Sequence, residues 1–434
     1  MNYRFTLRPG LVFHDGNPVT SKDVIASLRR WGGRDTLGRK LMAAVGSLNA
    51  VDDRTFELKL EKPFGWVLYA LGKPGSPVPF IMPERLARTP ISEQITEVIG
   101  SGPFVFNKAR WKPGSLMVFE KFKDYKPRSE PADFLAGGKV VHVDRVEWQV
   151  IPDNNTAIAA LQAGELDYVQ YPSFDILPVL ERDPKVKVVG FTGPNMFMGN
   201  YRINQGNPPF DDPDIRRVLW NLVDQQEVLN ALGVPKEFSM TCNSFWMCNS
   251  PFETEAGNEP YAKRSIAATK AALAKTKYKG EKVILLQVTE LDAGRVPTEI
   301  MAQRMREAGF NVEMQSMDWN TLLSRRTLKD GWHLYGIHAS GFDLMSPLTH
   351  FYVAQNCVKD VGWHCDERLT KLLDEFQAAS DHDGQKRLAE EIQKVVYQIS
   401  PAILYGQFAQ PAAYRTDLKG VIESSIPVFW NIRK

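Results

Sequence analysis

Long apolar runs, a strong net charge and abundant cysteine are all missing from this 434-residue sequence. Lys, Asp, Pro or Gly interrupts every apolar stretch, so none reaches the roughly 18 apolar residues that a membrane span needs. The 53 basic and 51 acidic side chains leave a formal charge of +2, which provides no field to attract a polyanion. The sequence therefore predicts a soluble globular protein that does not bind nucleic acid.

Recognisable catalytic and metal-binding patterns are also missing. Seven histidines fall in scattered positions, and His14-Asp15 is explained more simply by turn chemistry than by a catalytic pair. Gly100-Ser-Gly102 lacks the lysine and the serine or threonine of a phosphate-binding loop. Glu165 and Asp167 share one face of an expected strand, which solvent exposure explains. We therefore predict a protein without catalytic residues, cofactor or metal, and a hydrolase is the less favoured alternative.

The four cysteines form two close pairs in polar stretches, Cys242 with Cys248 and Cys357 with Cys365. Such short loops suggest local disulfides that hold surface loops in an oxidising compartment. Free thiols in a cytosolic protein are one alternative. A zinc site is another, because His350 and His364 interleave with the second pair, although the spacing matches no zinc finger or ribbon.

The pattern of expected elements indicates an α/β protein with more than one core. The chain is longer than one hydrophobic core usually serves, so two lobes are expected. Thr20 to Asp23 has the pattern of a helix capping box. From residue 265 onward helices and strands alternate, as in α/β units. The expected helices there are 265–275, 297–308, 320–328, 367–378 and 383–399, and the expected strands are 282–288, 311–317, 333–338 and 402–408.

Four longer motifs occur along the chain, at Tyr3–Val24 (YRFTLRPGLVFHDGNPVTSKDV), Ile99–Phe104 (IGSGPF), Ala160–Asp167 (ALQAGELD) and Asn207–Val218 (NPPFDDPDIRRV). In this order they resemble motifs of the family 5 solute-binding proteins, which include the dipeptide and oligopeptide receptors of bacterial ABC importers. The resemblance covers the whole chain. In that family the first motif lies well inside the mature protein, which implies that a signal peptide and the first strands of one lobe precede Met1.

The resemblance implies the type II periplasmic-binding-protein fold, in which two α/β lobes enclose the ligand and the first lobe carries an extra subdomain. Carried over, residues 1–100 are the extra subdomain, 101–224 with 405–434 form lobe I, and 225–404 form lobe II. The implied role is a periplasmic receptor, expected to be monomeric, that closes about hinges near 101, 224 and 405. It would deliver a peptide or other small amine-bearing solute to the permease. A ligand of another class, such as an opine, sugar or aromatic acid, is the alternative.

The loop Ala339–Pro347 is the first candidate ligand site because it follows an apolar strand of the expected parallel sheet. Asp343 matches the acid that binds a peptide's α-amino group in the family, and Ser340, Gly341 and Phe342 accompany it. A carboxylate can also cap its own turn beside Ser346 and Pro347, so both interpretations stay open. Where dipeptide receptors supply an arginine, this chain reads Gln287–Asp292, which contains none. Arg295, Arg325 and Arg326 lie near, but a solvated surface role explains each of them better.

Six further residues are predicted to contact the ligand. Tyr405 and Gln407 lie on the expected returning strand, which crosses the floor of the ligand site in the family. Met198 and Asn200 alternate on a strand that is expected to line the first lobe. Trp319 and Trp332 lie at strand ends, where flat side chains can sandwich an apolar ligand, although core packing explains each of them as well.

Overall fold

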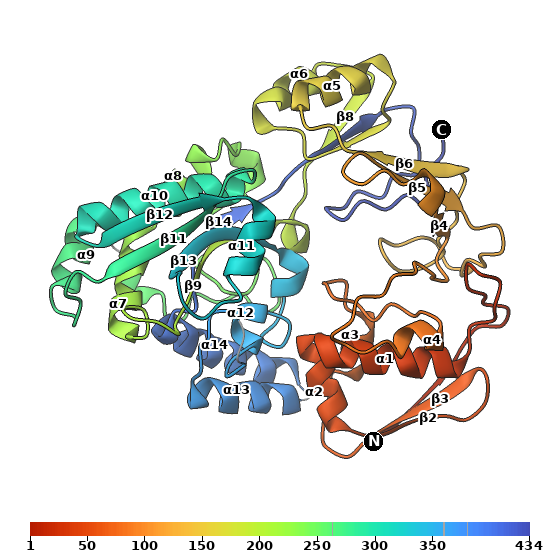
Figure 1. The fold of residues 1–434 in the computed structure, drawn as a ribbon, viewed down its shortest axis with the longest axis horizontal. Coiled ribbons are helices and arrows are strands. Elements are labelled where there is room, and N and C mark those ends of the chain that lie inside the picture. Colours follow the sequence, from red (N-terminus) through yellow and green to blue (C-terminus); the bar gives the residue numbers. More distant parts are fainter. Residues whose placement is uncertain (263, 359–360, 380) are drawn as a thin grey trace. The chain divides into compact units, whose positions relative to one another are not determined.

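The computed structural model describes residues 1–262, 264–358, 361–379 and 381–434, which form two compact units of mixed α and β structure (Figure 1). Unit 1 is Met1–Phe191 with Pro411–Lys434, and unit 2 is Thr192–Gln410. The chain thus passes between the units twice. Among the described residues, no helix has the length and apolar character needed to cross a membrane.

The first part of unit 1 is an antiparallel sheet of order β1–β3–β2 with four helices beside it. The predicted capping box is confirmed, because the Asp23 carboxylate accepts a hydrogen bond from the Thr20 N–H at 2.8 Å. Its second oxygen accepts a hydrogen bond from the Glu84 N–H at 2.7 Å. The same carboxylate therefore caps the first turn of α1 and binds the first residue of α4. The elements are β1 (Asn2–Thr6), α1 (Ser21–Arg34), α2 (Thr36–Ala44), β2 (Val45–Ala50), β3 (Thr55–Leu60), α3 (Val67–Gly72) and α4 (Glu84–Ala87).

The remainder of unit 1 contains two more three-stranded sheets, β4–β5–β6 and β7–β15–β8. β15 follows the second passage between the units and pairs antiparallel with both β7 and β8. The C-terminal segment therefore completes a sheet begun much earlier in the chain. The elements are β4 (Phe104–Phe106), β5 (Leu116–Lys121), β6 (Arg145–Gln149), α5 (Asn154–Ala163), β7 (Tyr168–Gln170), α6 (Leu177–Glu181), β8 (Val186–Val189) and β15 (Ala412–Arg415).

Unit 2 is built on one six-stranded sheet of order β10–β14–β9–β13–β11–β12. Its central strands are almost fully buried, as expected for apolar strands covered on both faces. β11 is parallel to β12 and β13, while β9 is antiparallel to both of its neighbours. The strands are β9 (Phe197–Ile203), β10 (Ser239–Met240), β11 (Lys282–Val288), β12 (Asn311–Met317), β13 (Leu334–Ser340) and β14 (Ala402–Phe408).

The helices of unit 2 surround this sheet, and α10 packs along β11, β12 and β13 (Figure 1). The expected helix start at Pro297 is wrong: α10 begins at Asp292 and contains Pro297 in its interior. The helices are α7 (Pro213–Val218), α8 (Gln225–Ala231), α9 (Ile266–Leu273), α10 (Asp292–Ala308), α11 (Trp319–Arg325), α12 (Phe351–Ala354), α13 (Glu367–Ala378) and α14 (His382–Ile399).

The boundaries between the two units differ from the lobe boundaries that were expected from the sequence. The passages lie at Phe191–Thr192 and Gln410–Pro411, whereas the expected lobe limits were 224/225 and 404/405. The reason is β9, which pairs with both β13 and β14 and so belongs to the sheet of unit 2. The predicted extra subdomain 1–100 lies within unit 1.

Candidate functional site

The carboxyl ends of four strands meet at one edge of the unit 2 sheet. β11, β12 and β13 are parallel, and β14 runs with β13 because both are antiparallel to β9. β9 begins at this same edge, where Phe197 pairs with Ser340 and Phe408. The chain enters unit 2 just before Phe197 and leaves it just after Phe408. Both connections to unit 1 therefore join unit 2 at this edge. We call residues 192–197, 289–295, 318–320, 340–347 and 409–410 the carboxyl edge, the place where α/β sheets commonly bind ligands.

The predicted loop around Asp343 lies on the carboxyl edge. It is a short helical turn, Gly341–Leu344, that directly follows β13. The Gly341 N–H donates to the Met196 carbonyl at 2.9 Å, and a Cβ on Gly341 would lie 2.7 Å from that oxygen, so the contact requires glycine. Phe342 is buried in this turn, whereas Ser340 and Asp343 are only half-buried. The apolar residue thus anchors the turn, and the two polar ones keep partial access to solvent.

His338, which was not among the predicted site residues, lies on the same strand face as Ser340. Its ring packs edge-on against Phe197 and Phe408, with ring centroids 4.8 and 5.7 Å away. Nδ1 is buried and has no hydrogen-bond partner among the described residues. Burial lowers the pKa of His338 to about 4, so the ring is neutral at pH 7. The period of two along β13 places it beside Ser340, and this signal was available in the sequence.

Acidic residues outnumber basic ones at the carboxyl edge. Its residues include four acids, Glu290, Asp292, Asp318 and Asp343, and one arginine, Arg295. Arg295 pairs with Asp292 at 2.7 Å and with Glu299 of the next helical turn at 3.5 Å. The local charge therefore favours a cationic group over an anionic one.

The other two arginines considered from the sequence make contacts within unit 2. Arg325 donates to the Gln315 side chain at 3.2 Å and to the Gly331 carbonyl at 2.9 Å. Arg326 donates to the Tyr335 hydroxyl at 3.3 Å. Tyr335 belongs to the amino-terminal end of β13, so Arg326 is directed to the sheet end opposite the carboxyl edge.

The two predicted tryptophans lie at opposite ends of the sheet. Trp319 follows β12, is half-buried at the carboxyl edge, and donates its backbone N–H to Glu290 at 2.6 Å. That contact is the main cause of the lowered pKa of Glu290. Trp332 precedes β13, is fully buried in the core, and donates its indole N–H to the Leu328 carbonyl at 2.8 Å. Trp332 is therefore a core residue away from the edge.

Tyr405 is a buried residue of the sheet-to-helix interface. It occupies the irregularity where β14 slips against β9, and its ring covers Gly199, where a Cβ would come within 1.8 Å of the ring. Its hydroxyl donates to the Ala293 carbonyl at 2.5 Å. Pro297 has no N–H with which to bind that carbonyl within α10, so the tyrosine supplies the missing donor. This explains both the interior proline and the burial of Tyr405.

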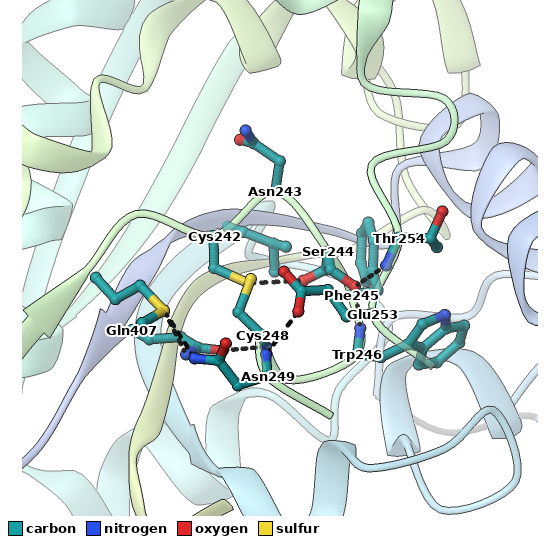
Figure 2. The surroundings of a disulfide bond; sticks show 12 residues. Cys242, Asn243, Ser244, Phe245, Trp246, Cys248, Asn249, Glu253, Thr254 and Gln407 are labelled. Carbon is teal, nitrogen blue, oxygen red and sulfur yellow. Dashed lines mark hydrogen bonds between the residues drawn. A yellow bond between two sulfur atoms is a disulfide. The ribbon is translucent and has the colours of Figure 1, made fainter. Parts of the chain in front are cut away.

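Gln407, Met198 and Asn200 are fully buried in the β9–β14 part of the sheet. Gln407 accepts a hydrogen bond from the Cys248 N–H at 2.7 Å and so holds the loop closed by the Cys242–Cys248 disulfide, as Figure 2 shows. Asn200 donates to the Met198 carbonyl at 3.2 Å. The expected placement of Met198 and Asn200 in the first lobe is wrong, since β9 belongs to unit 2.

Both predicted disulfides are confirmed, and both lie in unit 2. Because Cys357 and Cys365 are bonded to each other, the alternative zinc site with His350 and His364 has lost its thiolate ligands. Within the described residues, no three His, Cys, Asp or Glu side chains gather in a way that could hold a metal. The loop 242–248 carries Phe245 and Trp246 into the core, both fully buried.

Comparison with known proteins is consistent with this fold. The probable peptide ABC transporter periplasmic-binding protein y4tO of Sinorhizobium fredii is 36% identical over 443 residues, spanning 100% of this chain and 82% of that protein. The binding protein AgaA from A. tumefaciens R10, solved with agropinic acid, superposes with a TM-score of 0.80 at 21% identity, over 100% of this chain and 86% of AgaA. The oligopeptide-binding protein AppA of Bacillus subtilis, solved with a nonapeptide, gives 0.77 at 20% identity, over 98% and 84%.

The match to a family profile agrees with the resemblance seen in the sequence motifs. Residues 1–359 match the profile described as bacterial extracellular solute-binding proteins, family 5 Middle. The solved structures share the type II fold of these binding proteins. With most of its length in that match and a 36% identical relative along the whole of it, the chain belongs to family 5 of the bacterial extracellular solute-binding proteins.

Proposed function

We propose that this protein is the periplasmic receptor of an ABC importer, which binds a small amine-bearing solute such as a peptide and hands it unchanged to the permease. Family membership and the 36% identical relative, named as a peptide transporter component, support the receptor role. One observation carries the choice of ligand: Asp343 is half-buried on an acid-rich carboxyl edge. The receptor acts as a monomer, without cofactor or catalysis.

The chemistry of Asp343 fits a primary ammonium group. A carboxylate that becomes desolvated on ligand binding attracts an ammonium more strongly than it does in water, and the three N–H donors bind several acceptors at once. Ser340 adds a hydroxyl two residues from the buried Phe342 anchor. Phe197, which is half-buried and packs against His338, gives the same edge an apolar surface for the rest of the ligand.

A non-peptide solute is the second candidate, and one observation favours it. A peptide's far carboxylate calls for a cation, and Arg295, the arginine of the carboxyl edge, is already paired with Asp292 and Glu299. AgaA, which shares the fold, was solved with agropinic acid, so the fold accepts ligands other than peptides. An opine combines an amine with other polar groups and meets the same acidic edge.

The direct experiment is a thermal-shift screen of the purified protein with dipeptides, tripeptides, opines, sugars and aromatic acids. A ligand that binds only the folded state raises the melting temperature by mass action. We expect stabilisation by amine-bearing compounds and none by their N-acetylated forms. Mass spectrometry of the released ligand should show an unchanged compound. Conversion of the ligand, or equal binding of the acetylated forms, would contradict the proposal.

Asp343→Asn is the matching variant. It keeps the size of the side chain and removes the charge, so we expect a ligand Kd about 10- to 100-fold higher, as for loss of a charged hydrogen bond of roughly 1.5–3 kcal/mol. Isothermal titration calorimetry with the best compound of the screen measures this. Asp374→Asn, an exposed acid on α13, is the control and should bind as the wild type does. Equal affinities for the wild type and Asp343→Asn would remove Asp343 from the site.

A further inference from the structure

Unit 1 contains a cavity that lies outside the ligand site proposed above, and we call it the basic cavity. Its volume is about 510 Å³. Pockets for small molecules have volumes of roughly 300–1,000 Å³, so it has room for one. The cavity is bordered by α1, by residues 48–50 of β2, and by the segment from Glu84 of α4 to Ile91. These elements pack together at the start of the chain (Figure 1).

The helix α1 presents two exposed cations to the basic cavity. Lys22, Ala26 and Arg29 line it and are spaced four and three residues apart, which places them on one face of the helix. The small side chain of Ala26 leaves space between the two cations. Among the residues that the structure describes, Arg29 makes one side-chain hydrogen bond, from Nη2 to the Leu48 carbonyl at 3.0 Å. Its other N–H groups are therefore available to a ligand.

A third cation of the basic cavity, Arg30, is buried. Its guanidinium donates to the carbonyls of Thr89, of Pro90 at 3.2 Å and of Glu93 at 3.0 Å. These bonds fix the segment that forms the wall opposite α1. Carbonyl groups are uncharged acceptors, so the positive charge of Arg30 is not neutralised by them.

The side chains that line the basic cavity carry an excess of positive charge. They include the cations Lys22, Arg29, Arg30 and Arg88 and one carboxylate, Glu84, which pairs with Arg88 at 2.6 Å. Throughout the described part of the chain, no carboxylate forms an ion pair with the other three cations. The whole chain has a formal charge of only +2, so this concentration of charge is local, and it attracts an anion.

The remaining walls indicate which kind of anion fits. Ile25, Leu48 and Ala87 line the basic cavity and are buried, so part of its surface is apolar. A phosphate monoester carries about 1.5–2 negative charges at pH 7, which suits a site with several cations. The planar guanidinium of arginine matches the geometry of phosphate oxygens. A phosphate joined to an apolar organic group therefore complements both kinds of wall.

We propose that the basic cavity binds a small organic phosphate ester, with the phosphate between Lys22 and Arg29 and the organic group against Ile25 and Leu48. This site is a second one on the protein. It goes beyond the receptor function proposed for unit 2, and it does not depend on the ligand bound there.

The test is isothermal titration calorimetry of the 434-residue protein with phenyl phosphate, and phenol is the uncharged control. We expect phenyl phosphate to bind at least tenfold more tightly than phenol. The double variant Lys22→Gln with Arg29→Gln should raise the Kd for phenyl phosphate at least tenfold. The matched control is Lys59→Gln with Arg39→Gln, which changes two exposed cations of the same part of unit 1 outside the cavity and should bind as the wild type does. Equal binding of phenol, or equal binding by the two double variants, would overturn the proposal.

Hydrogen exchange of the wild type localises the binding without any substitution. Phenyl phosphate should slow amide exchange in α1 and in residues 84–91 and leave β6 unchanged. Protection elsewhere in the chain without protection of α1 would also overturn the proposal.

Vesicles of phosphatidylglycerol distinguish a lipid headgroup from a soluble ester as the source of the phosphate. If the wild type sediments with the vesicles and the Lys22→Gln, Arg29→Gln variant does not, the site takes a lipid headgroup. If phenyl phosphate binds and neither protein sediments, it takes a soluble ester. Both results support the proposal, whereas equal sedimentation of the two proteins together with equal affinity for phenyl phosphate contradicts it.

Discussion

The central strands of the unit 2 sheet are more deeply buried than the strand β6 of unit 1. Unit 2 joins six strands in one sheet, and the central strands β9 and β14 are buried along almost their whole length. Unit 1 divides nine strands among three separate sheets, and β6 alternates between exposed and half-buried residues. A strand covered on both faces loses most of its contact with water, whereas the short strands of unit 1 leave part of their apolar surface uncovered.

This difference in burial predicts a difference in stability between the two units. In unit 2 large aromatic side chains are fully buried, among them Trp220, Trp246 and Trp332, and two disulfides close its loops. In unit 1 Trp148 of β6 and Phe429 of the C-terminal segment line open cavities instead. We expect unit 2 to be the more stable unit, and matched changes in the two units can test that difference.

Replacing one tryptophan in each unit should give the largest contrast. Trp332→Ala removes a fully buried side chain and its indole hydrogen bond, so we expect a loss of about 3–5 kcal/mol in unit 2. Trp148→Ala removes a half-buried side chain beside existing space, so we expect about 1 kcal/mol in unit 1. Calorimetry combined with hydrogen exchange separates the units, since a two-unit chain need not unfold in one step. Equal losses would refute the comparison.

The elements of unit 2 could be predicted from the sequence almost residue by residue. The expected strands 282–288, 311–317 and 402–408 are β11, β12 and β14 as observed, because apolar runs bounded by turns specify buried strands well. The start of α10 was missed because a proline normally marks a helix start. Its tolerance inside α10 depends on Tyr405, more than a hundred residues away, whose hydroxyl satisfies Ala293. Local sequence contains no signal for that compensation.

The candidate site could be predicted only in part. The loop at Asp343 was found because it follows an apolar strand, and the structure places it at the carboxyl edge. Tyr405, Gln407 and Met198 were read as ligand contacts, but they are fully buried. Alternation along a strand tells which residues share a face, and it does not tell which faces other elements cover. Their roles as ligand contacts remain predictions, and the buried positions favour the edge residues over them.

Acid should weaken unit 2 more than unit 1. Burial lowers the pKa of His338 to about 4 and that of His350 to about 3. An unfolded histidine has a pKa near 6.5. Below that pH the unfolded chain therefore binds protons at these histidines, whereas the folded chain keeps the rings neutral. The stability from each neutral ring is therefore complete above about pH 6.5 and is lost as the pH falls through the folded-state pKa, by roughly 3 kcal/mol for His338.

The measurement is denaturant unfolding at pH 7.0, 5.5 and 4.5, followed by hydrogen exchange in each unit. His338→Gln should reduce the pH dependence of unit 2, because a glutamine does not titrate. His142→Gln, at an exposed position of unit 1, is the control and should leave the pH dependence unchanged. If unit 1 lost its protection at a higher pH than unit 2, buried histidines would not explain the acid sensitivity.

The smallest of the expected effects on unit 2 should come from the disulfide that closes the loop 242–248. Replacing both Cys242 and Cys248 by serine releases a short loop, so the chain-entropy cost is about 2 kcal/mol. Gln407, Gln225 and Gln393 still bind the backbone of this loop, through Cys248, Cys242 and Phe245 respectively, which should keep the loop close to its native position. We therefore expect unit 2 to melt several degrees lower, with unit 1 and ligand affinity unchanged.

A reductant should reproduce this shift in the wild type and add the contribution of Cys357–Cys365, whereas in the double-serine variant it should give only that second contribution. A loss of affinity in the double-serine variant without loss of stability would mean that the loop acts at the ligand site instead of stabilising the fold. Because unit 1 contains no cysteine, any effect of reductant on its exchange must be transmitted from unit 2, and the size of that effect measures how strongly the two units are coupled.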